Sequence, residues 1–287
     1  MNKKIAFLTT IFPMDKTYLY DFFNSLQKQT YQNFGVIVVN DGYTNLEEFI
    51  REFKSLSIIE LQHSDTPAKN REFGINYIRE NNYDVLIFGD SDDYFDTNRI
   101  QLSIDLLNDF DVVVNDLTLF DEQNGIYNKK YISNRIKDAT KIEFDFIKDK
   151  NIFGLSNTAV NVSILDNIHF DKDLIAVDWY LYSTLLLRNK KAIFTNKTIT
   201  YYRQYANNTI GIGSNTTETI LKGISVKSKH YSSLQKEYNI FTELHENILK
   251  LKKRVKDQHG IEELNTQNIE NPLWWEEIKL IKEGNAT

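Results

Sequence analysis

The chain has no cysteine among its 287 residues, and this absence removes several kinds of chemistry at once. Disulfide scaffolds, cysteine-ligated zinc, iron–sulfur clusters and thiol catalysis all require that side chain. No run of residues approaches the ~18 consecutive apolar positions that a membrane helix needs. The first four residues, Met-Asn-Lys-Lys, lead into a strand-like run without a signal-peptide pattern. We therefore expect a cytoplasmic protein.

An excess of positive charge is also missing. The chain has 34 Lys and Arg against 40 Asp and Glu, a formal charge of −6, which is a poor basis for binding nucleic acid. In contrast, 41% of the residues are hydrophobic, as in folded globular proteins. The length fits two domains, or one large α/β domain with an appendage.

Glycine is scarce, with 11 residues, and the first of them is Gly35. The segment from Thr9 to Lys16, which follows the first strand-like run, therefore lacks a glycine-rich loop. Nucleotidyltransferases, dinucleotide-binding proteins and P-loop enzymes need such a loop there to cradle phosphates. The Gly-x-Ser-x-Gly elbow of serine hydrolases is absent as well. These absences argue against all four classes.

Short apolar runs alternate with amphipathic segments between residues 5 and 114. This alternation predicts βαβ units and a mostly parallel sheet sandwiched by helices, which is the α/β fold class. The expected strands are residues 5–8, 36–39, 57–61, 85–88 and 112–114, and the expected helices are residues 18–26, 46–53, 67–78 and 98–107.

The pattern changes after Asp116. The Asn124-Gly125 pair predicts a tight turn between two hairpin strands. From about Glu218 the chain is helical, so we expect a first domain over residues 1–215 and a helical C-terminal extension over residues 216–287. Between these points the expected elements are hairpin strands at residues 117–120 and 126–132, helices at residues 141–148 and 177–187, and a strand at residues 198–203.

The C-terminal extension carries one apolar stripe and a basic face. Residues 221–256 hold nine Lys and Arg against three Glu, a charge of +6. The favoured interpretation is that the stripe packs onto the first domain or onto a second copy of the chain, giving a homo-oligomer. The alternative is peripheral contact of the basic face and Trp274-Trp275 with anionic lipid or a phosphate-bearing acceptor. The stripe consists of Leu234, Tyr238, Phe241, Leu244, Ile248, Leu251 and Val255.

Polar residues follow three of the expected strands at their carboxyl ends. Thr9 and Thr10 follow the first strand, residues 40–42 the second, and residues 90–93, called the acidic turn below, the fourth. Because ligands of open parallel sheets bind beyond the carboxyl ends of the strands, we expect these residues to line one crevice.

The acidic turn has three carboxylates within four residues, Asp90, Asp92 and Asp93. A divalent cation would relieve their repulsion, and Mg²⁺ or Mn²⁺ needs only one or two protein carboxylates when phosphate oxygens complete its shell. The indicated ligand is then a nucleotide diphosphate. The alternative, a turn that caps the helix expected at Asn98, is equally compatible with this motif alone.

Three segments in order resemble family 2 of the GT-A glycosyltransferases. Residues 38–45 end a strand in Asn-Asp-Gly, residues 68–74 resemble an Ala-x-x-Asn-type helix start, and residues 83–95 end a strand in Asp-x-Asp-Asp. The match extends over roughly the first 110 residues, and more loosely to about residue 213. The resemblance implies a GT-A-type fold, with residues 1–215 as the nucleotide-sugar-binding and catalytic domain.

The resemblance also implies site residues by position. Asp90 and Asp92 correspond to the carboxylates that hold the ribose and the metal, so they are the expected ligands of Mn²⁺ or Mg²⁺. The expected nucleotide-binding residues are Thr9 and Thr10 against the nucleoside, Asp41 at the base, Lys69 and Arg71 near the base and diphosphate, and Asp90 at the ribose.

Asp178 is the expected catalytic base. The family places Glu-Asp and an aromatic residue at a helix start, and residues 177–179 keep the Asp and Trp but not the Glu. The alternative role of Asp178 is an N-cap, where the helix dipole stabilises a carboxylate. Arg203 lies in a segment that resembles the Tyr-Arg-x-His closure over the diphosphate, with Tyr205 in place of His. Arg203 is expected to pair with phosphate, the alternative being a surface ion pair.

The resemblance implies an inverting, metal-dependent glycosyltransferase of glycan biosynthesis. It would move a hexosyl or N-acetylhexosaminyl group from a UDP-linked donor to an acceptor hydroxyl on a glycan, a lipid-linked glycan or a protein. The Gln-x-x-Arg-Trp signature of processive synthases is absent. The alternative, favoured by the missing Glu and by Tyr205, is a catalytically degenerate module that binds a nucleotide or a partner.

Overall fold

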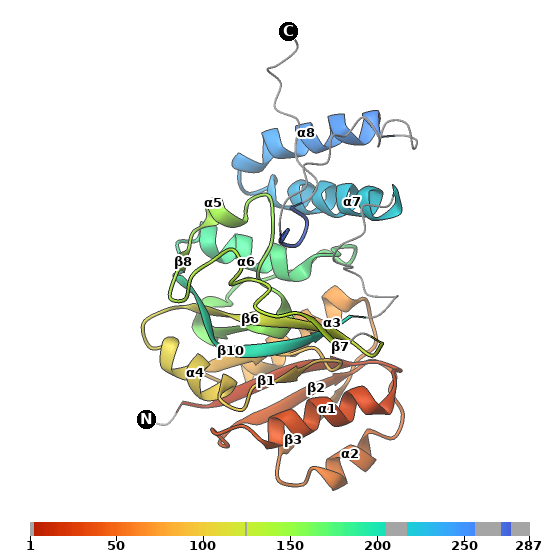
Figure 1. Cartoon of the computed structure of the whole chain (residues 1–287), viewed down its shortest axis with the longest axis vertical. Coiled ribbons are helices and arrows are strands. Elements are labelled where there is room, and N and C mark those ends of the chain that lie inside the picture. Colours follow the sequence, from red (N-terminus) through yellow and green to blue (C-terminus); the bar gives the residue numbers. More distant parts are fainter. Residues whose placement is uncertain (1–2, 124, 205–216, 256–270, 277–287) are drawn as a thin grey trace.

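The structure, a computed structural model, describes residues 3–123, 125–204, 217–255 and 271–276. Within these residues a ten-stranded sheet has the order β3-β2-β1-β4-β9-β6-β10-β5, with β7 beside β6 and β8 beside β10 (Figure 1). The strands are β1 (Ile5–Ile11), β2 (Gly35–Asn40), β3 (Ser57–Gln62), β4 (Val85–Phe88), β5 (Tyr94–Phe95), β6 (Val112–Asp121), β7 (Gly125–Asn128), β8 (Lys141–Ile142), β9 (Thr158–Asn161) and β10 (Ala192–Arg203).

Helices cover both faces of the sheet. They are α1 (Lys16–Gln27), α2 (Leu46–Glu52), α3 (Pro67–Glu80), α4 (Arg99–Leu106), α5 (Phe144–Ile147), α6 (Val177–Leu187), α7 (Thr217–Leu234) and α8 (Ile240–Arg254). In Figure 1, α1 and α2 lie on one side of the sheet, whereas α6, α7 and α8 follow one another outward on the other side.

The alternation of side chains along β1 shows why the strands are apolar throughout. Ile5 and Phe7 belong to one core with α1, α2 and α4, and Ala6 and Leu8 belong to the other core with α3 and α6. Successive side chains of a strand point to opposite faces, so a sheet covered by helices on both faces needs an unbroken apolar run.

The parallel part of the sheet agrees with the expected α/β fold. Strands β3, β2, β1 and β4 pair in parallel, and β6 pairs in parallel with β10. The structure adds an antiparallel strand that the sequence did not predict, β9, between β4 and β6. Its sequence, Thr-Ala-Val-Asn, contains only two apolar residues, so no strand pattern marks it.

Two elements between residues 126 and 148 differ from the expectation. The second hairpin strand ends at Asn128, because the Asp116 carboxylate accepts hydrogen bonds from Ile132 N (2.9 Å) and from Ser133 and so holds the following residues in turns. The helix expected at residues 141–148 is divided into β8, which pairs with β10, and the short α5.

The apolar stripe of the C-terminal extension packs within the chain. Five of its residues are at most 2% exposed, and α7 contacts α6 through the rings of His230 and Trp179, whose centroids are 3.9 Å apart. These five residues are therefore not available to a second copy of the chain, which was the other expected partner. They are Leu234, Phe241, Ile248, Leu251 and Val255.

The lipid-contact hypothesis for Trp274-Trp275 is wrong for Trp274. This side chain is 3% exposed and packs against Tyr131 and Tyr202 of the first domain, so it is not available to a membrane surface. Among the helices that the structure describes, none combines the length and the apolar character needed to span a bilayer.

Candidate active site

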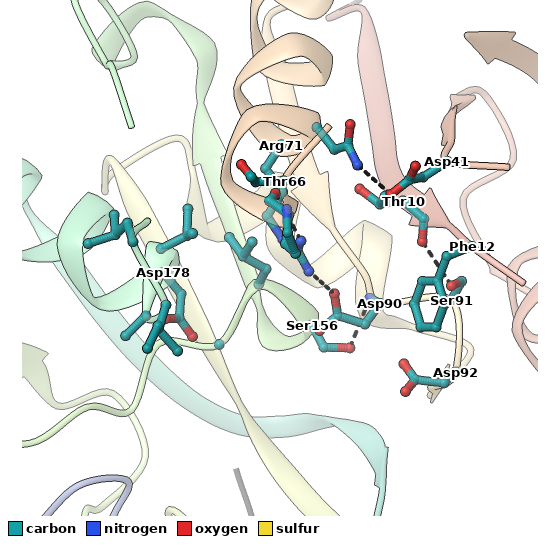
Figure 2. Close-up of a pocket in the computed structure, with 18 of the residues that line it drawn as sticks. Thr10, Phe12, Asp41, Thr66, Arg71, Asp90, Ser91, Asp92, Ser156 and Asp178 are labelled. Carbon is teal, nitrogen blue, oxygen red and sulfur yellow. Dashed lines mark hydrogen bonds and ion pairs between the residues drawn. The ribbon is translucent and has the colours of Figure 1, made fainter. Parts of the chain in front are cut away.

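A cavity of about 700 Å³ lies beyond the carboxyl ends of β1, β2 and β4 (Figure 2). Its volume falls within the range of about 300–1,000 Å³ that is usual for ligand pockets. One side is polar and includes Thr10, Asp41, Arg71, Asp90 and Asp92. The other side comes from the residues before α6, from α6 itself and from residues 274 and 275. The crevice expected from the strand ends is therefore present.

The carboxylate of Asp41 is fixed by neighbouring side chains. Its Oδ2 accepts a hydrogen bond from Nδ2 of Asn70 at 2.8 Å, and its Oδ1 accepts one from Oγ of Ser64 at 2.5 Å. Asn70 is fully buried in the first turn of α3, and its Oδ1 lies 2.8 Å from Nδ1 of His63. Asp41 is therefore held at the cavity wall, where a carboxylate can accept from a ligand N–H.

Gly89 brings the acidic turn close to the core. A Cβ atom at this position would lie 2.5 Å from the ring of Phe7 and 2.7 Å from that of Phe95, so no larger residue fits without displacing a ring. Asp90 follows directly. Its Oδ1 lies 3.3 Å from Nη2 of Arg71, and its backbone N donates to Oγ of Ser156 at 3.2 Å. Both contacts fix Asp90 at the cavity wall (Figure 2).

The third carboxylate of the acidic turn, Asp93, does not line the cavity. It is 1% exposed, and it accepts hydrogen bonds from the hydroxyl of Ser156 and from the backbone N of Arg203 at 2.8 Å. Burial raises the pKa of Asp93 well above its ordinary value, and the charges of Asp92 and Asp90 raise it further. Two carboxylates, Asp90 and Asp92, therefore remain for a ligand.

The alternative role of the acidic turn, capping a helix, does not describe the structure. The cap residue of α4 is Asn98, and its Nδ2 donates to the backbone oxygen of Lys197 instead of capping the helix. The backbone N of Arg99, the first residue of α4, donates to the backbone oxygen of Asp96. The acidic turn ends three residues before Asp96, so it does not begin this helix.

Asp178 lies on the opposite side of the cavity from Asp41 (Figure 2). The N-cap residue of α6 is Ala176, so Asp178 is not the cap, and its Oδ1 accepts a hydrogen bond from the adjacent backbone N of Trp179 at 2.7 Å. Burial raises the pKa of Asp178 to about 7, and the negative charge of Asp90 adds to the rise. A carboxyl with this pKa can accept a proton near neutral pH.

Three residues expected to bind the nucleotide do not line this cavity. Thr9 is 2% exposed within β1. Nζ of Lys69 lies 2.9 Å from Oε2 of Glu72 on its own helix. Arg203 is not at the surface, since its side chain is 6% exposed and lies behind the acidic turn. Thr10, Asp41, Arg71, Asp90, Asp92 and Asp178 do line the cavity; Tyr205 lies outside the described residues.

The sequence also left several residues of the site without a role. Ser156, which contacts both Asp90 and Asp93, lies in the small-residue stretch 154–158, whose composition is the signal that could have marked it. Tyr202 lines the cavity, and burial together with the carboxylates of Asp93 and Asp90 raises its pKa well above the ordinary value. No local pattern places Trp274 and Trp275 there, because they come from the far end of the chain.

The donor atoms at the acidic turn fit a hard divalent cation. Asp90 and Asp92 offer carboxylate oxygens at the cavity wall, which suit Mg²⁺ or Mn²⁺ when phosphate oxygens and water complete the shell. Within the described residues no group of three or more His, Asp or Glu side chains forms a complete metal site. The arrangement thus resembles a site shared between protein and ligand.

The fold is that of the GT-A glycosyltransferases. The structure superposes on residues 1–349 of S. aureus TarS in complex with UDP-GlcNAc with a TM-score of 0.59 and 16% identity, covering 88% of this chain and 72% of that one. It is also similar to the mannosyltransferase PcManGT of Pyrobaculum calidifontis in complex with GDP-Man and Mn²⁺, with a TM-score of 0.57 and 11% identity, covering 83% of this chain and 66% of that one. At these identities the similarity establishes the fold.

The sequence profile of Glycosyl transferase family 2 matches residues 14–168, more than half of the chain, so the chain belongs to that family. The glycosyltransferase GlyA of Streptococcus pneumoniae serotype 4 is 24% identical over 219 residues, which cover 71% of this chain and 31% of GlyA. An uncharacterized glycosyltransferase of Rickettsia bellii is 36% identical over 83 residues, 28% of this chain and 12% of that protein. The chain therefore spans less than a third of either relative.

Proposed function

We propose that this chain is an inverting, metal-dependent glycosyltransferase. It transfers a hexosyl or N-acetylhexosaminyl group from a UDP-linked donor to an acceptor hydroxyl, with Asp178 as the general base. The proposal is supported most by one observation: Asp178, whose pKa is raised to about 7, lies across a single cavity from the paired carboxylates of the acidic turn. UDP-GlcNAc in S. aureus TarS and GDP-Man in PcManGT are consistent with a nucleotide-sugar donor.

The polar side of the cavity is the proposed donor site. Asp41, held by Asn70, would accept a hydrogen bond from the N3–H group of uracil, and Thr10 would lie against the nucleoside. Asp90 would bind the ribose, and Arg71 beside it would pair with the diphosphate. Thr9, Lys69 and Arg203 do not line this site, so we give them no direct contact with the nucleotide.

Asp90 and Asp92 would hold Mn²⁺ or Mg²⁺ together with the diphosphate oxygens. The bound ion would neutralise the negative charge that develops on the leaving diphosphate. The Mn²⁺ present in PcManGT is consistent with such a cofactor.

Asp178 would act on the acceptor. As the acceptor oxygen forms its bond to the anomeric carbon, its proton passes to the Asp178 carboxylate, and the bond from that carbon to the diphosphate oxygen breaks. The electron pair of the broken bond leaves with the diphosphate. Because attack and departure take place on opposite faces in one displacement, the anomeric configuration inverts.

We also propose that residues 1–215 form the nucleotide-sugar-binding and catalytic domain, with residues 216–287 as its extension. The extension shares the core of α3 and α6, so it is not expected to fold alone. Residues 274 and 275 also line the cavity, which gives the extension a part in the site.

Titration calorimetry of UDP in the presence and absence of Mn²⁺ tests the donor site. We expect Mn²⁺-dependent binding that Asp92→Asn weakens at least tenfold. The matched control, Asp109→Asn, removes an exposed carboxylate outside the cavity and should leave the affinity unchanged. Absence of any Mn²⁺-dependent UDP binding by the native chain would contradict the donor assignment.

Release of UDP from UDP-linked sugars tests the catalytic assignment. Asp178→Asn should keep UDP affinity but lose about 10²–10⁴-fold in rate, the usual contribution of a general base. A native chain that binds UDP with Mn²⁺ yet neither transfers nor hydrolyses any donor would instead support the degenerate binding module.

A further inference from the structure

We propose that the part of the cavity beyond Asp178 is a subsite for a carbohydrate acceptor, with the ring of Trp275 as its platform. The inference rests on the proposed function, because it names the class of acceptor whose hydroxyl Asp178 would deprotonate. The platform belongs to residues 271–276, called the C-terminal segment below, which Figure 1 shows in dark blue beneath α7.

The backbone of the C-terminal segment is anchored to the first domain at several points. The Tyr131 hydroxyl donates to the backbone oxygen of Pro272 at 2.8 Å. The backbone N of Asn151 donates to the backbone oxygen of Trp274 at 2.9 Å. The guanidinium of Arg135 makes two hydrogen bonds to the carboxylate of Glu276, at 2.8 and 3.0 Å. Such a paired contact fixes orientation as well as distance. The segment is therefore a fixed part of the cavity wall.

Trp274 shows how closely the segment fits. A Cβ atom on Gly154 would lie 3.0 Å from the Trp274 ring, so a larger residue there would require the ring to move by a few tenths of an ångström. The ring also packs edge-on against Tyr202, with centroids 5.8 Å apart. The buried Trp274 ring thus fixes the segment against the protein. The next residue, Trp275, is less buried and lines the same cavity.

The backbone of Trp275 has a φ of +67°, a conformation that bulky L-residues rarely adopt. Such a conformation costs on the order of 1–3 kcal/mol, persists only where the surroundings impose it, and occurs preferentially at ligand sites. Here the anchors on both sides, at Trp274 and Glu276, impose it. The strain thus points to a use for the Trp275 ring in the cavity.

The chemistry around the ring is that of a sugar site. Leu174, Ile175 and Val177 line the same cavity as Trp275 and give it apolar surface, and the exposed residues Lys172 and Asp173 line it too. A pyranose has an apolar face of C–H groups and an edge of hydroxyls, so it matches an aromatic face bordered by charged hydrogen-bonding groups. Asp178 lines the same cavity, so we expect its carboxylate to reach a hydroxyl of a sugar seated on the ring.

Two other acceptor classes match the surface less well. A lipid chain requires a continuous apolar rim, but next to exposed Ile175 the rim carries Lys172 and Asp173. One common way to bind an extended peptide is to add it as a strand to an unpaired sheet edge. The wall at this end of the cavity is instead formed by the short helical turn Leu155–Asn157, the start of α6 and the C-terminal segment.

Saturation-transfer NMR with methyl pyranosides of glucose, galactose and N-acetylglucosamine tests the subsite. The native chain, saturated with UDP and Mn²⁺, should transfer saturation to at least one of these glycosides. Trp275→Ala should weaken that glycoside's binding at least tenfold and leave the UDP dissociation constant within twofold. Trp275→Phe, which keeps an aromatic face, should recover most of the affinity. The control Leu249→Ala, on an exposed part of α8, should change neither value.

Ile175→Ala supplies a second test that does not depend on the folding of Trp275→Ala, because Ile175 is 44% exposed. This variant should also weaken glycoside binding. Intact UDP binding with no bound glycoside, or glycoside binding that neither Trp275→Ala nor Ile175→Ala alters, would overturn the subsite while leaving the proposed function in place. Loss of UDP binding by the native chain would instead overturn the proposed function and the subsite with it.

Discussion

Nε of Arg203 donates a hydrogen bond to the backbone oxygen of Asp92 at 2.9 Å, which ties the end of β10 to the acidic turn. The same guanidinium pairs with the carboxylate of Asp21 at 2.6 Å, and the backbone N of Arg203 donates to Asp93 at 2.8 Å. Arg203 therefore supports the turn from behind, rather than meeting phosphate in the cavity.

Replacing Arg203 by Met should loosen this support. Hydrogen bonds to charged groups contribute about 1.5–3 kcal/mol each, and Asp21 is half exposed, so we expect the free energy of unfolding to fall by about 2–3 kcal/mol. Urea denaturation measures this value. The matched control is Arg51→Met, which breaks an exposed ion pair with Glu47 and should cost less than about 1 kcal/mol. Equal effects of the two substitutions would contradict the supporting role of Arg203.

The rate of transfer should depend on pH through Asp178. Because burial raises its pKa to about 7, the carboxylate is largely protonated below that value and cannot take the acceptor proton. We expect kcat/KM to fall about tenfold for each pH unit below 7. Steady-state rates between pH 5 and 8.5 check this fall in kcat/KM. If the residual activity of Asp178→Asn showed the same fall below pH 7, the titration would belong to another group.

The same pKa predicts a pH-dependent gain in stability for Asp178→Asn. The folded native chain holds the Asp178 proton up to about pH 7, whereas the unfolded chain releases it near its ordinary value of 3.8. Burial of this carboxyl therefore costs stability progressively as pH rises between these values. A rise of about three pKa units corresponds to about 4 kcal/mol, so without metal the variant should melt several degrees above the native chain at pH 8. At pH 4 the two proteins should melt at the same temperature. Identical melting temperatures at both pH values would argue against the raised pKa.

Asn70 should control the selectivity for the nucleotide base. Asn70→Ala removes the hydrogen bonds to the Asp41 carboxylate and to the backbone oxygen of Asp65, so we expect a loss of about 1–3 kcal/mol in stability. Asp41 would also lose its fixed orientation. UDP affinity should fall at least tenfold, and the preference for UDP over GDP should narrow, both measured by calorimetry. The control is Asn76→Ala, at a half-buried position of the same helix that does not line the cavity. An unchanged preference would remove Asn70 from base selection.

The sequence predicted those parts of the site that depend on local pattern. The acidic turn, Asp41 and Asp178 each follow a strand or begin a helix whose periodicity is clear, so the topology alone brings them to one cavity. The positions of these strands and helices agree with the prediction to within a few residues, because their apolar runs are long or regular.

The remaining parts depend on contacts between distant residues. Arg203 finds its partner Asp21 182 residues away, and nothing near Arg203 in the sequence indicates that pairing. Likewise β9 forms because Ala159 and Val160 fit between two strands that are already apolar, not because its own pattern is strong. Trp275 reaches the cavity because its two neighbours contact residues far away in the sequence: Trp274 packs against Gly154, and Glu276 bonds to Arg135.

The burial of Asp93 has a consequence for the electrostatic balance of the site. Since its neutral form is favoured, the formal charges facing the cavity at the acidic turn are those of Asp90 and Asp92. A divalent ion held by these residues would cancel the two charges, and the guanidinium of Arg71 would then leave one surplus positive charge. With an ionised Asp93 the same groups would sum to zero. The proton on Asp93 would thus turn a neutral turn into one that attracts an incoming pyrophosphate.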